Sequence, residues 1–317
     1  MGNVTGSAAI KIRALQKTFS NGWGKRSVII KNLNLDIMDN EIFGYLGANG
    51  AGKTTTFKLM LGLIFPDKGD VFFWEKPAAD YKNRSFIGYL PENPYFYSYL
   101  TAEESLDFYA SLFDMNTTVK KQRVAEMLHL VGLNHAKDLQ LRKFSRGMLQ
   151  RIGIAQAMIN DPKLLILDEP MSGLDPMGRK DMRDIILNCR DQGKTVIFSS
   201  HIISDVELIC DRASILSKGE LKQVVEMDDR QNTEDSIWEI ICQGNALDIS
   251  TIKEYGKIKH LVTGNRNIFS TTDKGLANRM MDEIKNQGLD LISFGSRRKN
   301  IEDIYIKSVN VEGKNHG

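Results

Sequence analysis

A single eight-residue run constrains this chain more than any other feature of its sequence. Residues 47–54 read Gly-Ala-Asn-Gly-Ala-Gly-Lys-Thr, which fits the phosphate-binding pattern G-x-x-x-x-G-K-[ST]. Glycines permit the sharp backbone turns that point successive N–H groups at a polyphosphate. Residues 42–46 before the run have the composition of a buried strand, and a helix is expected from Lys53 onward. The run therefore predicts an α/β core built around a nucleotide site.

The residues of this loop have separate expected roles. Lys53 would place a cation against the terminal phosphates, and the Thr54 hydroxyl would bind Mg²⁺. The alternative, a glycine-rich surface turn, fits the strand–loop–helix setting less well. The residues of the run and its flank that we expect to bind ATP are Gly47, Asn49, Gly50, Ala51, Gly52, Lys53, Thr54 and Thr55.

Length and composition exclude several classes of protein. At 317 residues the chain is long for one domain, and its net charge of +2 argues against a broad nucleic-acid-binding surface. No run of ~18 or more residues is both strongly apolar and uncharged, so we expect no spanning helix. Residues 1–7 lack the blocks of a signal peptide, and the widely spaced cysteines suit a reducing cytosol. These features predict a soluble cytoplasmic chain.

The pattern of apolar residues divides the chain into regions. Residues 163–168 and 194–199 are almost continuously apolar, as strands buried on both faces of a parallel sheet are. Residues 101–144 have helical periodicity, opened by the capping box Thr101-Ala-Glu-Glu104. We expect a nucleotide-binding domain over 1–225 with a helical subdomain over about 93–145. A polar linker over 226–235 and a small C-terminal α/β accessory domain over 236–317 would follow.

A pair of carboxylates supplies the second half of the expected site. Asp168 and Glu169 follow the apolar segment Leu164-Leu-Ile-Leu and precede Pro170. An aspartate at the tip of a buried strand can complete the Mg²⁺ shell opposite Thr54. Glu169 is then placed to deprotonate a water that attacks the γ-phosphate. The alternative interpretation of Asp-Glu-Pro is a charged strand end that breaks into a turn. The presence of a phosphate loop in the same chain makes the catalytic interpretation the favoured one.

A further motif carries the resemblance to a known family. Residues 144–151 read Phe-Ser-Arg-Gly-Met-Leu-Gln-Arg, which resembles the Leu-Ser-Gly-Gly-Gln signature of ATP-binding-cassette (ABC) transporter subunits. Ser145 and Gly147 match this signature, Phe144 and Arg146 depart from it, and Met148 stands in the final position. The resemblance covers roughly residues 9–225 and implies a P-loop NTPase core of ABC type, with an antiparallel β subdomain and a helical insertion.

The resemblance also implies roles for residues outside the three motifs. Asp175 matches the aspartate of the loop that communicates between two cassettes, and His201 matches the switch histidine that contacts the γ-phosphate. Phe19 corresponds to the aromatic residue that stacks on adenine, with Trp23 as the rival candidate. Glu92 stands where the family usually has glutamine, and a carboxylate there could still bind Mg²⁺.

A cluster of aromatic residues follows Glu92. Residues 95–99 read Tyr-Phe-Tyr-Ser-Tyr, four aromatic residues in five positions. They could fill the core, or they could form a docking surface for a partner. In the resembled family this region receives the coupling helix of a membrane subunit, which places the expected contact near Glu92–Leu100.

Together these features predict the ATP-hydrolysing subunit of an ABC transporter. The tail over 297–307 resembles the end of export-type cassettes, so the expected direction of transport is export. Two copies would hold each ATP between Lys53 of one and the signature of the other. The partners expected are a second cassette and a separate permease at the cytoplasmic face of the membrane, and not nucleic acid. Two alternatives stay open: a soluble ABC-type ATPase that acts on ribosomes or nucleic acid, and a scaffold that binds nucleotide without hydrolysis.

Overall fold

The computed structural model describes residues 7–21, 25–227, 236–244 and 258–298. The chain divides into two compact units, Met1–Asp228 and Asp229–Gly317. Several sequence features lie outside the described residues: Trp23, most of the expected linker, and nearly all of the export-type tail after Arg298. Within the described ranges, no helix is long and apolar enough to cross a membrane.

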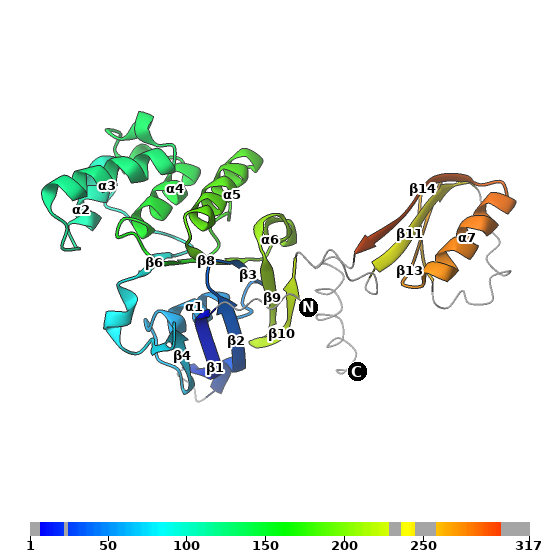
Figure 1. Cartoon of the computed structure of the whole chain (residues 1–317), viewed down its shortest axis with the longest axis horizontal. Coiled ribbons are helices and arrows are strands. Elements are labelled where there is room, and N and C mark those ends of the chain that lie inside the picture. Colours follow the sequence, from blue (N-terminus) through cyan, green and yellow to red (C-terminus); the bar gives the residue numbers. More distant parts are fainter. Residues whose placement is uncertain (1–6, 22–24, 228–235, 245–257, 299–317) are drawn as a thin grey trace. The chain divides into compact units, whose positions relative to one another are not determined.

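The first unit is built on a six-stranded sheet with the order β10-β9-β3-β8-β7-β6 (Figure 1). Strands β6, β7, β8, β3 and β9 run parallel, and β10 is antiparallel to β9 at the edge. Every residue of β3, β7 and β8 is buried, which confirms the prediction of strands covered on both faces. The strand bounds are β3 Ile42–Gly47, β6 Ile87–Leu90, β7 Leu164–Leu167, β8 Thr195–Ser200, β9 Arg212–Ser217 and β10 Glu220–Glu226.

A second, antiparallel sheet in this unit has the order β2-β1-β4-β5. Helix α1 packs between the two sheets, where Phe57 and Met60 join a core that includes Ile12, Leu35 and Phe43. The long strands β1 and β2 give this sheet most of its pairing. The bounds are β1 Ala8–Asn21, β2 Lys25–Met38, β4 Lys68–Phe73, β5 Lys76–Pro77 and α1 Lys53–Met60.

The phosphate-binding pattern folds into the predicted strand–loop–helix. β3 ends at Gly47 and α1 begins at Lys53, the helix start expected from the sequence. Gly50 and Gly52 have φ of 78° and 112°, a region that other residues rarely adopt. A Cβ on Gly52 would also lie 2.7 Å from Ile30 Cδ1. Both steric reasons favour glycine in this loop.

Helices gather on the side of the six-stranded sheet opposite the antiparallel sheet (Figure 1). The predicted capping box opens α2: Thr101 Oγ1 accepts from Glu104 N, and Glu104 Oε2 accepts from Thr101 N at 2.8 Å. Asn116 caps α3 and Ser145 caps α4, each by a side-chain oxygen that accepts from a backbone N–H of the first turn. The bounds are α2 Ala102–Ala110, α3 Thr117–Leu130, α4 Arg146–Ala157, α5 Pro176–Asp191 and α6 Ile203–Ile209.

The described part of the second unit is a four-stranded antiparallel sheet, order β12-β13-β11-β14, with one helix packed against it. Its own core includes Ile240, Phe269, Met280 and Ile284. The bounds are β11 Ser236–Gln243, β12 Lys259–Thr263, β13 Arg266–Thr271, α7 Lys274–Asn286 and β14 Asp290–Arg298.

Candidate functional site

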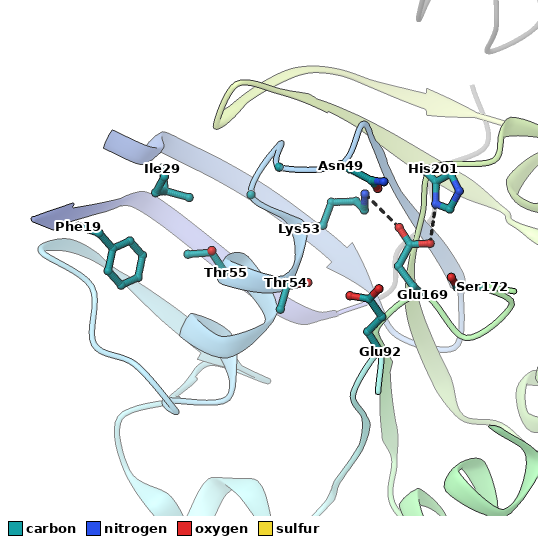
Figure 2. Close-up of a pocket in the computed structure, with 12 residues that line it drawn as sticks. Phe19, Ile29, Asn49, Lys53, Thr54, Thr55, Glu92, Glu169, Ser172 and His201 are labelled. Atoms are coloured by element: carbon teal, nitrogen blue, oxygen red, sulfur yellow. Dashed lines mark hydrogen bonds and ion pairs between the residues drawn. The ribbon is translucent and has the colours of Figure 1, made fainter. Parts of the chain in front are cut away.

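A cavity of about 560 Å³ lies in the first unit, between the phosphate loop and the carboxyl ends of the parallel strands. The loop leaves β3, Asp168 and Glu169 follow β7, and His201 follows β8, and these strands are neighbours in the order β3-β8-β7. Open α/β sheets bind ligands at this edge. The cavity is lined by Phe19, Ile29, Asn49, Gly50, Gly52, Lys53, Thr54, Thr55, Glu92, Glu169, Ser172 and His201 (Figure 2).

The centre of the cavity holds a chain of three charged or polar side chains. Lys53 Nζ lies 3.0 Å from Glu169 Oε1, and His201 Nδ1 lies 2.9 Å from Glu169 Oε2 (Figure 2). A carboxylate can only accept, so His201 donates from Nδ1 and its other ring nitrogen, Nε2, does not take part in this bond. Lys53 also donates to the carbonyl of Gly47 at 2.6 Å. The phosphate loop and both strand-end residues are therefore linked directly.

Asp168 does not line the cavity. Its side chain is 1% exposed. Oδ1 accepts a hydrogen bond from Ser199 Oγ at 2.7 Å, whereas Oδ2 is buried and has no hydrogen-bond partner among the described residues. Burial, together with the charge of Asp168, raises the pKa of Tyr89 on β6 to about 12. A buried anionic oxygen without a partner is costly unless a cation binds it.

An aromatic and an aliphatic residue line the part of the cavity farthest from Glu169. Phe19 on β1 and Ile29 on β2 lie there, with Thr55 of α1 beside them (Figure 2). Phe19 is 40% exposed, so it is not a core residue, and Lys17 Nζ lies 5.4 Å from its ring centroid. An exposed ring at this end can stack on a flat heterocycle.

Glu92 lines the cavity opposite the phosphate loop, near Glu169 (Figure 2). Its backbone is held by α4, the helix that begins with the signature residues, because Gln150 Nε2 on α4 donates to the Glu92 carbonyl at 3.2 Å. Gln150 itself is buried. This hydrogen bond couples the start of α4 to one wall of the cavity.

The signature residues do not line the cavity of their own chain. Ser145 and Asp175 are N-caps of α4 and α5, and each accepts from a backbone N–H three residues on. The Arg146 side chain covers Gly173, where a Cβ would lie 2.4 Å from the guanidinium carbon. The start of α4 and the loop before α5 therefore form one surface. Gly147 and Met148 are half-buried at the start of α4.

The aromatic cluster has one buried and three exposed members. Phe96 is buried and packs edge-on against Tyr109, whereas Tyr95, Tyr97 and Tyr99 are exposed. The Tyr97 ring lies 5.6 Å from that of Phe108, at 90°. A groove of about 940 Å³ runs along these rings and is lined by Tyr97, Tyr99, Leu100, Glu103, Glu104, Asp107, Phe108, Ser111, Lys121 and Val124.

Comparison with known proteins agrees with this geometry. A family model described as ABC transporter matches residues 30–172. An ABC transporter ATP-binding protein of Nostoc sp. is 41% identical over 299 residues, which cover 93% of this chain and 88% of that protein. The chain belongs to the ABC transporter ATP-binding proteins. It is therefore an ATP-binding subunit of an ABC transporter, and it is an ATPase.

Two further ABC proteins extend the comparison. The bacitracin transport ATP-binding protein BcrA of Bacillus licheniformis is 32% identical, over 96% of this chain and 98% of that protein. The structure of cbiO1 from Clostridium perfringens, part of the ABC transporter complex cbiONQ, superposes with a TM-score of 0.62 at 29% identity. The superposed region covers 70% of this chain and 90% of the cbiO1 chain. Family membership confirms the predicted ABC-type fold class.

Three residues of this ABC site were not singled out by sequence reasoning: Ile29, Ser172 and Ser199. Ser172 lines the cavity from the loop after β7. Ile29 lines the cavity from β2, and Ser199 bonds to both Asp168 and Glu169 from β8. Two loop residues that were singled out, Gly47 and Ala51, do not line the cavity. Gly47 acts within the loop instead, as the acceptor for Lys53.

Proposed function

We propose that this ABC subunit hydrolyses ATP with Glu169 as the general base and thereby energises a separate membrane permease. The position of the Glu169 carboxylate carries the proposal: it lies between Lys53 of the phosphate loop and His201 of the neighbouring strand end. A base must lie within hydrogen-bond reach of the attacking water, at the place where the terminal phosphate binds. His201 orients the carboxylate, and Lys53 neutralises charge on the phosphates.

Mg²⁺ is the metal that this site fits. Asp168 Oδ2 is a buried carboxylate oxygen without a protein partner, and Thr54 brings a hydroxyl to the cavity. Hard oxygen ligands of this kind suit Mg²⁺, which also takes phosphate oxygens and water. Bound Mg²⁺ would neutralise phosphate charge, and Glu92 is the third candidate ligand.

The nucleotide itself would span the cavity. Phe19 stacks on adenine at one end, and residues 49–55 bind the phosphates toward Glu169. The signature residues Ser145, Arg146, Gly147 and Met148, with Asp175, act on the ATP of a second copy. The exposure of Ser145 and Asp175 at one surface supports this, as does their position away from the cavity of their own chain. ATP binding then drives closure of a homodimer.

The permease would dock at the groove beside residues 92–100. Exposed Tyr97, Tyr99 and Phe108 supply aromatic anchors, and Glu103 and Asp107 supply a polar rim. The chain would sit at the cytoplasmic face of the membrane through this contact. We propose export as the direction of transport, a proposal supported by the likeness to a bacitracin transport protein over almost the whole chain.

The test of the catalytic assignment is Glu169→Gln. We expect this variant to bind ATP as the wild type does, to lose roughly 100-fold or more of its hydrolysis rate, and to form a stable dimer with ATP and Mg²⁺. Glu126→Gln, an exposed carboxylate on α3, serves as the matched control. Turnover by Glu169→Gln at the wild-type rate would remove Glu169 from the role of base.

The test of the transport assignment uses the same variant as bait in native membranes. We expect Glu169→Gln with ATP and Mg²⁺ to co-purify with a multi-span permease. Adding Tyr97→Glu should reduce permease recovery without changing ATP affinity, because the groove lies apart from the cavity lining. Equal permease recovery with and without Tyr97→Glu would overturn the groove as the docking site.

A further inference from the structure

Ser199 on β8 lies between the two carboxylate residues of the site. Its side chain is fully buried, at 0% exposure. The hydroxyl donates to Asp168 Oδ1 at 2.7 Å and accepts from the backbone N–H of Glu169 at 2.8 Å. A backbone N–H can only donate and a carboxylate can only accept, so the hydroxyl proton has one arrangement that satisfies both. Ser199 therefore fixes two consecutive residues with a single group.

The contact with Glu169 supports an unusual backbone conformation. Glu169 has φ of 49°, a left-handed conformation that a residue with a side chain adopts at a cost in free energy. The β7–β8 ladder ends at Leu167 and Phe198, so the Glu169 N–H lies beyond the paired strands. Ser199 Oγ is the partner that this buried N–H has instead. The conformation in turn sets the direction in which the Glu169 side chain leaves the strand.

The contact with Asp168 decides which carboxylate oxygen is available. Because Oδ1 is held by Ser199, Oδ2 is left as the buried oxygen without a partner. Without the Ser199 hydroxyl the carboxylate could rotate, and neither oxygen would have a fixed position. The same hydroxyl thus orients the group proposed to hold the metal and the group proposed to take the proton.

We infer that Ser199 is a positioning residue that sets the mutual orientation of Asp168 and Glu169, so that turnover and metal-dependent binding, rather than ATP binding as such, depend on it. The inference rests on the proposed roles of these two carboxylates. The neighbouring residue Ser200 does not share the role of Ser199, because the Ser200 hydroxyl bonds to the backbone of Ile202.

The chain offers a matched control for the loss of a buried hydroxyl. Ser214 on β9 is also 0% exposed, and its hydroxyl has no hydrogen-bond partner among the described residues. Ser214→Ala therefore removes a buried strand hydroxyl from the same sheet without touching the site. Ser199→Thr retains a hydroxyl at the tested position and serves as the rescue variant.

The experiment compares Ser199→Ala, Ser214→Ala, Ser199→Thr and wild type as full chains. We expect Ser199→Ala to lower kcat about tenfold or more, because a hydrogen bond to a charged group contributes more free energy than one between neutral groups. The ATP affinity measured in EDTA should be unchanged. A second readout needs no turnover: in the Glu169→Gln background, Ser199→Ala should shrink the gain in ATP affinity that Mg²⁺ produces. Ser214→Ala should match wild type, and Ser199→Thr should recover part of the loss.

The outcomes separate this inference from the proposed function. A Ser199→Ala chain with wild-type kcat and an undiminished Mg²⁺ effect would overturn the inference and leave the ATPase assignment in place. An equal loss of kcat and of ATP affinity, together with a lowered melting temperature, would reduce Ser199 to a packing role and also overturn it. Inactivity of wild type and Ser214→Ala alike would instead count against the proposed function.

Discussion

Phe19 is the residue on which recognition of the base, as opposed to the phosphates, should depend. Its ring is 40% exposed beside the cavity, far from the Lys53–Glu169 pair (Figure 2). Stacking of a base on an aromatic side chain contributes about 1–3 kcal/mol, so we expect Phe19→Ala to weaken ATP binding by roughly tenfold. Titration with ATP and, in competition, with inorganic tripolyphosphate provides the measurement.

The competition supplies the control for that prediction. Tripolyphosphate has no base, so its affinity should be the same for Phe19→Ala and wild type, and Phe19→Trp should bind ATP normally. An equal loss for both ligands would mean that the substitution distorts the phosphate loop, and the stacking role would have to be abandoned.

Short motifs place residues of the candidate site most directly. The phosphate loop and the Asp-Glu pair assign Lys53 and Glu169 to one nucleotide site, and the structure has Lys53 Nζ 3.0 Å from Glu169 Oε1. Ser199 could not be predicted in this way, because its role depends on register between two apolar strands. Its only sequence signal is a polar residue near the end of a buried strand, two positions before His201.

At the scale of elements, Glu41 joins three strands of the first unit. It lies between β2 and β3, its Oε1 accepts from Met38 N at 2.6 Å, and Arg212 of β9 lies 3.2 Å away. Burial raises the pKa of Glu41 above its ordinary value of 4.5, and it outweighs the lowering effects of the Met38 N–H and of Arg212. The folded state therefore binds this proton more tightly than the unfolded state does.

The sign of the pH effect follows from that shift. The stability that protonation of Glu41 contributes is fully present below the unfolded pKa and is lost as the pH rises through the folded pKa. We expect the free energy of unfolding of wild type minus that of Glu41→Gln to fall as the pH rises above 4.5 toward neutrality. Urea titrations across this range provide the measurement, with Glu103→Gln as an exposed control. A difference that grows with pH would show that Arg212 outweighs burial.

Elements were predictable from the sequence when their local signals were strong. The capping box at Thr101 and the buried strands β7 and β8 appear where the sequence predicted them. Strand β2, from Lys25 to Met38, carries a weaker signal. Its first half carries exposed polar residues in an antiparallel pair with β1, and half-exposed edge strands lack the continuous apolar run of a buried strand.

At the scale of the whole molecule, the two units have separate hydrophobic cores and should unfold separately. Buried cysteines report on each: Cys189 and Cys210 lie in the first unit, and Cys242 lies in the second. Burial raises the pKa of Cys189 to about 12 and also raises the pKa of the Cys210 and Cys242 thiols. The thiolate is the reactive form, so alkylation of the folded chain at pH 8 should be slow.

We expect pulses of iodoacetamide at increasing urea to modify Cys189 and Cys210 together and Cys242 in a different transition, as read by peptide mass spectrometry. ATP with Mg²⁺ should raise only the first of these midpoints, because the cavity lies in the first unit. A ligand at 100 times its Kd adds about 2.7 kcal/mol to the unit that binds it. Cys242→Ser serves as the control for modification of the second unit, and it should leave the midpoint of the first unit unchanged. Modification of all three cysteines in one transition, shifted as a whole by ATP, would mean that the two units unfold cooperatively.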